Sequence, residues 1–252
     1  MREGSAKALW NLSYISDNRA AVAEAGGVKL LVDMLRSDDK DKHAAARALW
    51  NLAYSEPNRQ LISSAGGVRP LVALLKSDNV KEQEAATKAL VNLTQNEAIR
   101  REVAEAGAIG SLGKLVNSRS SSQRAAAARA LTNLAMHAEN RAQMEAGGMV
   151  LPGLIKMVTP LPRSAAESAQ KDTQAMNLAA LRALRNIIAD ERPRQSAREA
   201  GLVPTVKALT DDEITDKETR ELCLKILSEL SADKKSCMGR FSVVTANGDA
   251  SL

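Results

Sequence analysis

The sequence has few aromatic residues, few cysteines and no long apolar run. Aromatic residues make up 2% of its 252 residues, and its apolar residues are mostly Ala, Leu and Val, which favours closely packed helices. The two cysteines, Cys223 and Cys237, are too few for a disulfide scaffold or a zinc cluster. No stretch approaches the length of a membrane span, so we expect no membrane insertion. These absences favour the cytoplasm or the nucleus, and they predict no metal and no cofactor.

Residues suited to catalysis are also scarce. The two histidines, His43 and His137, lie far apart and are not paired with Cys or Asp at a useful spacing. The zinc-protease, nucleophile-elbow and P-loop motifs do not occur. We therefore expect no enzymatic activity, with His43 a surface residue and Cys223 a packing residue. The net charge of +5 favours acidic partners and does not indicate nucleic acid.

Two short motifs recur in step along the chain, which is the signature of a repeat protein. The first has the form Leu-x-Asn-Leu, and its central residues are separated by 40, 41, 41, 53 and 43 residues. The second is a glycine marker of the form Ala-Gly-Gly, whose first glycine follows the asparagine by 15 residues, or by 14 in the fourth repeat. The central residues are Asn11, Asn51, Asn92, Asn133, Asn186 and Glu229.

Each repeat is predicted to contain three helices, as residues 57–95 illustrate. A short helix over residues 57–64 ends at the glycine marker, where glycine can adopt the left-handed conformation that terminates a helix. A second helix over residues 68–77 has apolar residues at helical spacing, and a third covers residues 84–95.

The period, the three-helix unit and the two motifs together resemble the armadillo repeat over residues 1–232. The resemblance implies an all-α, right-handed superhelix of about five three-helix repeats plus a partial N-terminal repeat, with the third helices lining a concave groove. Residues 1–16 would be the third helix of the truncated first repeat, and residues 17–232 the armadillo repeats. We expect a loop insertion at 159–170, either a second contact site or a passive insertion, and a flexible tail at 233–252.

The two ends of the predicted solenoid differ. The first third helix has no preceding partners, which leaves the core-facing Leu9 and Leu12 uncovered. The chain is therefore expected to be a fragment of a longer solenoid, or to associate at that end with another chain, including a second copy of itself. The last repeat has Glu229 in place of Asn and more charged residues, as expected of a terminal cap.

Helical periodicity divides the motif at residues 46–52 into two faces. Ala48, Leu49 and Leu52 lie on one side and are expected to form the core. The central asparagine, with the residues four before, one before and three after it, lies on the opposite, exposed side. We call this second set of positions the groove face, because it would line the groove of an armadillo stack.

The groove face repeats its chemistry along the chain. The position four before the centre is basic in every repeat, and both tryptophans and both tyrosines of the protein lie on this face. The predicted basic residues are Lys7, Arg47, Lys88, Arg129 and Arg182, continued by Lys225. The predicted asparagines are Asn11, Asn51, Asn92, Asn133 and Asn186, and the aromatic residues are Trp10, Tyr14, Trp50 and Tyr54.

Each set has a functional interpretation and an alternative. In armadillo families such Asn rows hold the backbone of an extended peptide, and the resemblance implies that role; the alternative is an Asn that bonds only a neighbouring helix. Exposed Trp and Tyr favour a binding surface, with Arg47 or Lys7 stacking on the rings. The alternative is that missing sequence covers Trp10 and Tyr14. The basic row predicts an electropositive groove for an acidic ligand, against the alternative of a solvated helix face.

Five arginines form a second basic row, eight residues after each asparagine at the start of the short first helix. A cation at that position opposes its own helix dipole. We therefore expect a structural role, in which the guanidinium bonds carbonyl groups at the end of the preceding third helix. These residues are Arg19, Arg59, Arg100, Arg141 and Arg194.

These features predict a non-enzymatic scaffold that binds proteins through extended, acidic peptide segments. One alternative is the substrate-recruiting half of a ubiquitin ligase, as in plant U-box proteins with armadillo repeats. A second is a nuclear transport receptor. Importin-alpha-like receptors carry Trp four before the Asn to bind cationic cargo, whereas this chain carries Lys or Arg there. The groove is more similar to those of beta-catenin-like proteins, which take acidic segments.

Overall fold

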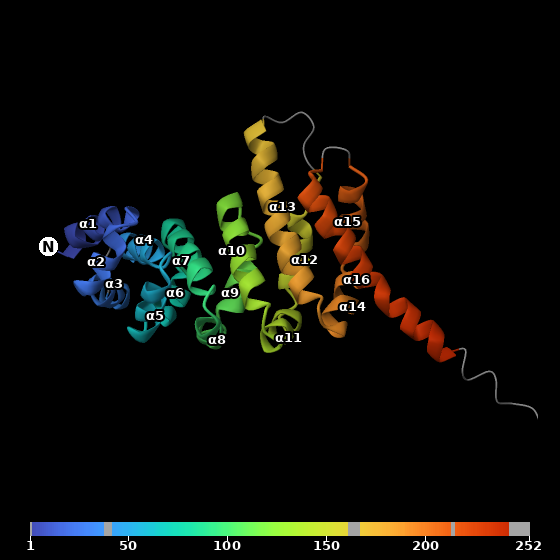
Figure 1. Ribbon diagram of the computed structural model, residues 1–252, viewed down its shortest axis with the longest axis horizontal. Coiled ribbons are helices and arrows are strands. Elements are labelled where there is room, and N and C mark those ends of the chain that lie inside the picture. Colours follow the sequence, from blue (N-terminus) through green and yellow to red (C-terminus); the bar gives the residue numbers. More distant parts are fainter. Residues whose placement is uncertain (1, 38–41, 161–166, 213–214, 242–252) are drawn as a thin grey trace, which may run out of the picture.

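The computed structural model describes residues 2–37, 42–160, 167–212 and 215–241, and over these residues all regular structure is helical. The helices follow one another in sets of three, and successive sets stack along one direction to form an elongated solenoid (Figure 1). The three-helix repeat that the sequence predicts is confirmed.

The first and second helices of each repeat form the outer layers of the stack. The first helices are α2 (Asn18–Glu24), α5 (Glu56–Ser64), α8 (Glu97–Glu105), α11 (Ala138–Ala146) and α14 (Glu191–Glu199). The second helices are α3 (Gly27–Arg36), α6 (Val68–Leu74), α9 (Ala108–Leu115), α12 (Val150–Met157) and α15 (Leu202–Thr210).

The third helices are generally the longest and pack against one another in chain order, from α1 on α4 to α13 on α16. The apolar residues that flank the central asparagines of α4, α7, α10 and α13 point away from the groove face and are fully buried between repeats, including Leu49, Leu52, Leu131 and Leu184. The predicted core face is therefore confirmed. The third helices are α1 (Arg2–Tyr14), α4 (Lys42–Leu52), α7 (Val80–Leu93), α10 (Ser121–Leu134), α13 (Glu167–Ile187) and α16 (Lys217–Phe241).

A glycine with positive φ lies after every first helix, where a left-handed residue turns the chain into the second helix. In the fourth repeat this residue is Gly148, with φ 64°, and not Gly147. Gly148 lies 15 residues after Asn133, so the turn keeps the same distance from the central asparagine in all five repeats. The spacing of 14 residues in the fourth repeat arises because it was counted to Gly147, whereas the second glycine of the pair makes the turn.

Two predicted irregular segments are partly helical. Helix α13 begins at Glu167, so residues 167–170 belong to a helix, whereas 161–166 lie outside the described residues. The good helix formers of 167–170 and an acidic residue in the first turn explain this extension. Helix α16 reaches Phe241, so 233–241 are helical and the expected tail is wrong for them; no proline interrupts the helix, and 242–252 lie outside the described residues.

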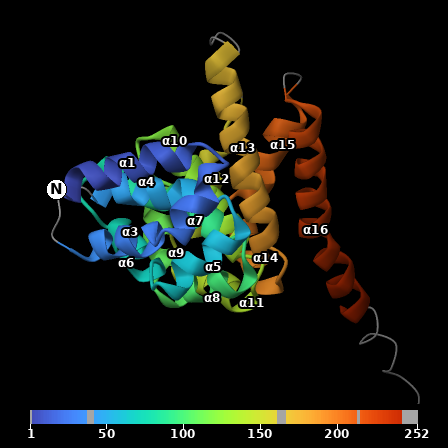
Figure 2. The same ribbon diagram turned by 60° about the vertical axis from the view of Figure 1, so that its left-hand side comes forward.

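Helix α13 projects beyond the shorter third helices before it (Figures 1 and 2). Its buried residue Asn177 ties down the segment after α12: Thr159 donates its backbone N–H to Asn177 Oδ1 at 3.0 Å, and Asn177 Nδ2 donates to the Thr159 carbonyl at 2.6 Å. At the other end, Leu12 of α1 is 48% exposed, as expected for a third helix without a preceding partner.

None of the helices within the described ranges combines the length and apolar character that crossing a membrane requires.

Candidate functional site

The asparagine row joins successive third helices. Asn51 Nδ2 donates to the carbonyl of Trp10 at 3.3 Å, and Asn92 Nδ2 donates to the carbonyl of Trp50 at 3.2 Å. The same bond runs from Asn133 to Val91 at 3.2 Å, and it recurs in the next repeat. The acceptor is always the residue just before the central position of the preceding third helix. The row therefore fixes the register between neighbouring helices, which was the alternative interpretation of these residues.

The asparagines are less exposed than the helical periodicity predicts. Asn51 is 6% exposed and Asn92 5%, because the neighbouring third helix covers them. The expectation that the central residue is fully exposed is wrong for these two positions. Only the amide nitrogen is engaged: no described residue donates to the side-chain oxygen of Asn51 or Asn92, and neither oxygen is enclosed. Each residue thus keeps a free acceptor at the groove face.

The fifth and first asparagines of the row complete the pattern. Asn186 Nδ2 of α13 donates to the Thr132 carbonyl of α10 at 3.0 Å, across the longer fourth repeat. Asn11 of α1 is exposed and makes no hydrogen bond to a described residue, since no third helix of the described chain precedes α1. The donor bond therefore requires a neighbour on the N-terminal side, which Asn11 lacks here.

Aromatic rings and cations alternate across α1, α4 and α7. The Arg47 guanidinium carbon lies 4.3 Å from the Trp10 ring centroid and 5.5 Å from that of Trp50. Lys88 Nζ lies 4.9 Å from the Trp50 ring centroid. The order Trp10, Arg47, Trp50, Lys88 forms a continuous series of cation–π contacts. Stacking of Arg47 on the rings, predicted from the sequence, is confirmed, and both tryptophans also pack against the core.

The two tyrosines occupy the position three after the asparagine and remain on the surface. Tyr14 is 75% exposed and Tyr54 53% exposed. Arg19 lies over the Tyr54 ring, with its guanidinium carbon 5.0 Å from the centroid. Tyr54, which follows α4, also lines a hollow of about 510 Å³ that extends over α7, α10 and α13 and includes Arg129. The tyrosines are therefore available to a ligand at the groove face.

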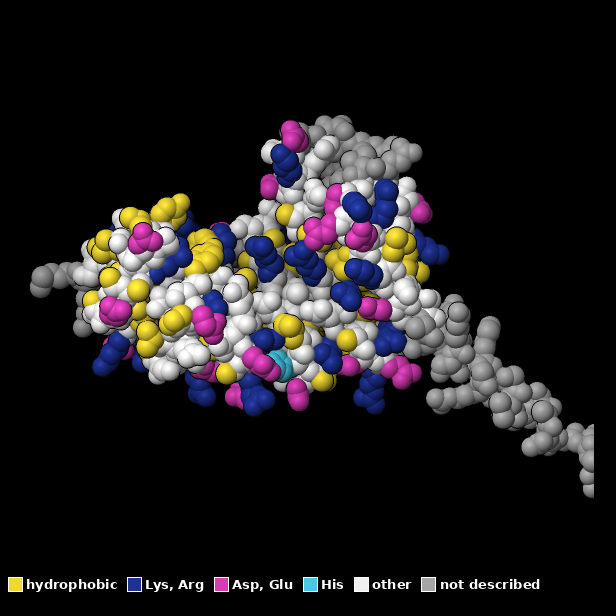
Figure 3. Space-filling model, in the orientation of Figure 1, with side chains coloured by type: hydrophobic (Ala, Val, Ile, Leu, Met, Phe, Trp, Pro, Cys, Tyr) yellow, Lys and Arg dark blue, Asp and Glu magenta, His cyan; other side chains and the backbone are white. Residues whose placement is uncertain are grey.

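The basic row is present as predicted, but its residues have different partners. Lys88 forms an ion pair with Glu84 at 2.6 Å within α7. Arg129 of α10 is exposed and has no hydrogen bond or ion pair with any described residue. Arg182 of α13 is bonded to Glu218 of α16 at 2.5 Å. Basic side chains gather over α10 and α13, with acidic ones beside them at the start of α16 (Figure 3).

Two cations of the groove face on α13, Arg182 and Arg185, are bonded to carboxylates of α16 that the sequence analysis did not identify as their partners. Arg185, one residue before Asn186, contacts Glu229 of α16 at 3.2 Å. The available signal was the replacement of the sixth asparagine by Glu229, which puts a carboxylate beside the basic row. Lys7 and Lys225 are exposed on the same face at the two ends. Within the described part of the row, Arg47 and Arg129 have no ion pair with a carboxylate, and both precede the carboxylates of α16.

The second basic row is structural at four of its five positions, as predicted. Arg59 Nη1 donates to the carbonyls of Ala53 and Tyr54 at 3.0 and 3.2 Å, and Arg19 and Arg194 bond the matching carbonyls at the end of the preceding third helix. Arg100 departs from the pattern: its Nη1 contacts Met136 Sδ at 2.8 Å and reaches no carbonyl. The prediction for Arg100 is therefore wrong.

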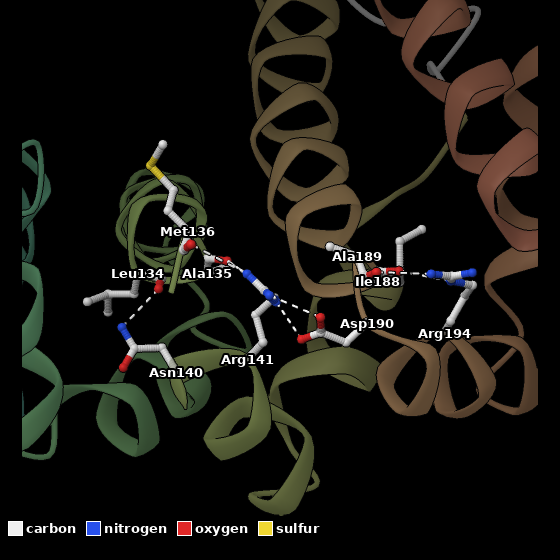
Figure 4. A network of polar contacts seen from close by, with 9 residues as sticks. All are labelled: Leu134, Ala135, Met136, Asn140, Arg141, Ile188, Ala189, Asp190 and Arg194. Atoms are coloured by element: carbon white, nitrogen blue, oxygen red, sulfur yellow. Dashed lines mark hydrogen bonds and ion pairs between the residues drawn. The ribbon is translucent and has the colours of Figure 1, made fainter. Parts of the chain in front are cut away.

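Arg141 joins two repeats as well as two helices. Its Nη1 bonds the carbonyls of Ala135 and Met136, while Nε and Nη2 hold Asp190 at 2.7 and 3.0 Å in a bidentate pair (Figure 4). This hydrogen-bonded guanidinium keeps the pKa of Asp190 below its ordinary value, and Asp190 raises the pKa of Arg141. The pair is absent from the other repeats described, and it strengthens the junction at the enlarged fourth repeat.

The remaining candidate residues have ordinary surroundings. His43 is half-buried, with its ring edge against Trp10 at a centroid distance of 5.8 Å, so the expectation of a plain surface residue is only partly met. Cys223 is fully buried, as predicted for a packing residue, and burial raises the pKa of its thiol to about 11. Within the described residues no three His, Cys, Asp or Glu side chains come together as a metal site.

Comparisons with known proteins agree with this architecture. The sequence model of the family described as the plant U-box protein armadillo repeat region matches residues 3–247. No curated protein sequence matches the chain significantly. An engineered protein of known structure is similar with a TM-score of 0.77 and 28% identity, covering 91% of this chain and 90% of that chain.

Two further solved structures share the fold. A designed armadillo repeat protein in complex with the peptide (KR)4 has a TM-score of 0.75 and 23% identity, covering 90% of this chain and 92% of that chain. An armadillo-repeats-only protein from Plasmodium falciparum has a TM-score of 0.72 and 18% identity, covering 84% of this chain and 95% of that chain. The predicted fold class, an armadillo-repeat solenoid, is therefore confirmed.

Proposed function

This chain belongs to the plant U-box protein armadillo repeat family, and on that premise we propose that it is a non-catalytic scaffold that binds an extended acidic peptide along the groove face. The observation that carries the proposal is Arg129. Its guanidinium lies exposed in the central hollow, in the register of the basic row, without a partner among the described residues. Surface cations are usually solvated, but this one lines the same hollow as Asn92 and Asn133, whose side-chain oxygens accept no hydrogen bond from a described residue.

The proposed roles come from the chemistry of each position. The free side-chain oxygens of the asparagines accept backbone N–H groups of the peptide, while their amide nitrogens hold the helices in register. Arg129 pairs with a peptide carboxylate, and Tyr54 provides an apolar wall with a hydroxyl. Packed helices lie roughly 8–10 Å apart and an extended chain rises about 3.3 Å per residue. An acidic side chain at every second or third peptide residue would therefore match the spacing of the basic residues on successive third helices.

The proposal is tested by fluorescence anisotropy with labelled peptides of equal length, built from acidic, neutral or basic residues at that spacing. The acidic peptide should bind and the basic peptide should not, with affinity that falls as salt rises. Arg129→Glu should weaken acidic binding by about tenfold or more, equivalent to at least about 1.4 kcal/mol.

The matched control is Arg101→Glu, which makes the same charge change at an exposed residue of α8, away from the third helices. An equal effect of both substitutions would mean that only net charge matters and would contradict a groove site. Preference for the basic peptide would favour the nuclear transport receptor instead.

A second candidate function is the recruitment of substrates for a ubiquitin ligase, which the match to the plant U-box armadillo region favours. The two functions use the same groove and differ in the fate of the bound partner. In a reconstituted reaction with the full-length protein, Arg129→Glu should reduce ubiquitin transfer to a partner bound through an acidic segment and leave self-modification unchanged. Loss of both would indicate a general defect rather than failed recruitment.

A further inference from the structure

A hollow of about 360 Å³ opens between α1, α4 and α7 at the N-terminal end of the groove face. Trp10 and Trp50 form its apolar walls, and Arg47 lies between the two rings. Lys81 and Lys88 line it from α7. The hollow thus combines aromatic walls with several cations, which is the composition of a site for an anionic group.

Arg47 is held in place but not satisfied. Its guanidinium donates no hydrogen bond to any described residue, and its Nε–H is enclosed without a partner. A guanidinium that stacks on an aromatic ring keeps its N–H groups in the plane of the fork, where they match the oxygens of a carboxylate or a phosphate. The remaining N–H groups of the guanidinium have no acceptor among the described residues, so an oxyanion in the hollow would supply one.

The charges of the hollow are not balanced. Lys88 is paired with Glu84, whose carboxylate also accepts from Ser122 Oγ at 2.9 Å, and the bond from Lys88 lowers the pKa of Glu84. His43 carries no compensating charge; its pKa is lowered by burial and then by the nearby cations Arg47 and Lys81. Arg47 and Lys81 form no ion pair with a described carboxylate, while Glu84, which also lines the hollow, pairs with Lys88 and has its pKa lowered further by the charge of Arg47.

We propose that this hollow binds the phosphate of a phosphorylated serine or threonine in the peptide. A phosphate monoester carries about −1.5 to −2 charge at neutral pH and three acceptor oxygens, which match the two cations, Arg47 and Lys81, that have no ion pair. A carboxylate brings one negative charge and suits the single unpaired cation Arg129 better. The inference rests on the proposed groove function. It assigns a phosphate to the hollow beside Arg47, whereas the other basic positions of the groove face would bind carboxylates.

The test uses sets of acidic peptides in which one position at a time carries phosphoserine, glutamate or serine, measured by isothermal titration calorimetry. At one position, phosphoserine should bind at least tenfold more tightly than glutamate. Arg47→Lys keeps the charge but removes the planar fork, and it should remove most of that preference. Arg129→Lys is the matched control and should leave the ratio of phosphoserine to glutamate affinities unchanged.

A second variant covers the case in which Arg47 substitutions disturb the stack. Lys81 is exposed, so Lys81→Gln should leave thermal unfolding unchanged and still reduce the phosphoserine preference several-fold. A preference that survives both Arg47→Lys and Lys81→Gln would overturn the assignment to this hollow. Binding of acidic peptides with no gain from phosphate would overturn this inference alone, whereas the absence of all acidic binding would overturn the proposed function as well.

Discussion

The two ends of the groove face hold their cations in opposite ways. In the N-terminal part, Arg47 lies on two indole rings and has no ion pair with a described carboxylate, and Lys88 lies on the Trp50 ring while it also pairs with Glu84. In the C-terminal part, Arg182 and Arg185 are bonded to the carboxylates of Glu218 and Glu229. A ring attracts a cation without taking its N–H groups, whereas a carboxylate both neutralises and occupies it. The same basic register is therefore open to an anionic ligand at one end and closed by α16 at the other.

What the two ends share is the stack itself. The buried leucines and the asparagine bond between third helices occur in both parts of the molecule, for instance at Leu49 and Asn51 and again at Leu184 and Asn186. What differs is the residue just before the asparagine, which is Trp50 in the first part and Arg185 in the second. This comparison separates positions that build the solenoid from the position that sets the chemistry of each rung.

The largest effect is expected where the two ends are equivalent. Leu49→Ala and Leu184→Ala each remove a fully buried side chain at the same repeat position. Both should lower the free energy of unfolding by about 2–5 kcal/mol, because a cavity is left between repeats. Urea unfolding followed by circular dichroism measures this loss. A large loss at one site and a negligible loss at the other would mean that the stack is not equally packed.

The asparagine row provides an internal contrast of intermediate size. Asn92→Ala removes the bond to the Trp50 carbonyl and should cost about 1–2 kcal/mol. Asn11→Ala changes the same repeat position where no such bond exists, and it should leave stability nearly unchanged. Thermal unfolding of the two variants decides the matter, since equal melting temperatures would rule out a register role for the row.

Removing the carboxylates that bond Arg182 and Arg185 should change the free energy of unfolding little and raise the affinity for an acidic peptide measurably. Glu218→Gln combined with Glu229→Gln frees Arg182 and Arg185 while changing the unfolding free energy by less than about 1 kcal/mol, because these ion pairs are partly exposed. Affinity for a long acidic peptide should rise several-fold in the anisotropy assay.

The control for that variant is Glu97→Gln with Glu105→Gln, two exposed residues of α8 that change the net charge equally. If the control raises affinity as much as the α16 variant, long-range charge explains the gain. Closure of the groove by α16 would then be wrong.

The smallest effect concerns the attachment of α16. With its pKa raised to about 11, the Cys223 thiol is protonated at pH 8 and should react with a thiol reagent only when α16 opens. The raised pKa also means that its contribution to stability is lost as pH rises from about 9 toward 11. A Cys237→Ser background leaves Cys223 as the only reporter. Rapid labelling at pH 8 without denaturant would contradict stable docking of α16.

The sequence predicts the repeated part of this structure well because the evidence for it is local and periodic. The burial of Leu49 and Leu52 is expected from helical spacing. The bond from Arg59 to the end of the preceding third helix is expected because a cation at the start of its own helix opposes that helix's dipole. Periodicity assigns the central asparagine to the groove side of its helix, but it carries no information on the neighbouring helix that covers Asn51. That contact depends on packing between repeats.

Contacts across the irregular repeats could not be predicted either. The pair between Arg141 and Asp190 and that between Arg182 and Glu218 each span a junction whose geometry depends on the length of α13 and α16. The sequence could not show that Gly148 makes the left-handed turn, because the adjacent Gly147 was equally suited to it. Sequence patterns identify the kinds of residue at each rung, whereas the partner of each cation is a tertiary property.

The most direct test of an acidic ligand at the N-terminal and central rungs is tryptophan fluorescence. Trp10 and Trp50 are the only tryptophans of the chain, and both lie on the groove face beside Arg47. Titration with an acidic peptide that lacks aromatic residues should change their emission saturably, with the same midpoint as anisotropy, and the matched basic peptide should not. Acidic binding that leaves both tryptophans unchanged, or a response to the basic peptide alone, would contradict the account.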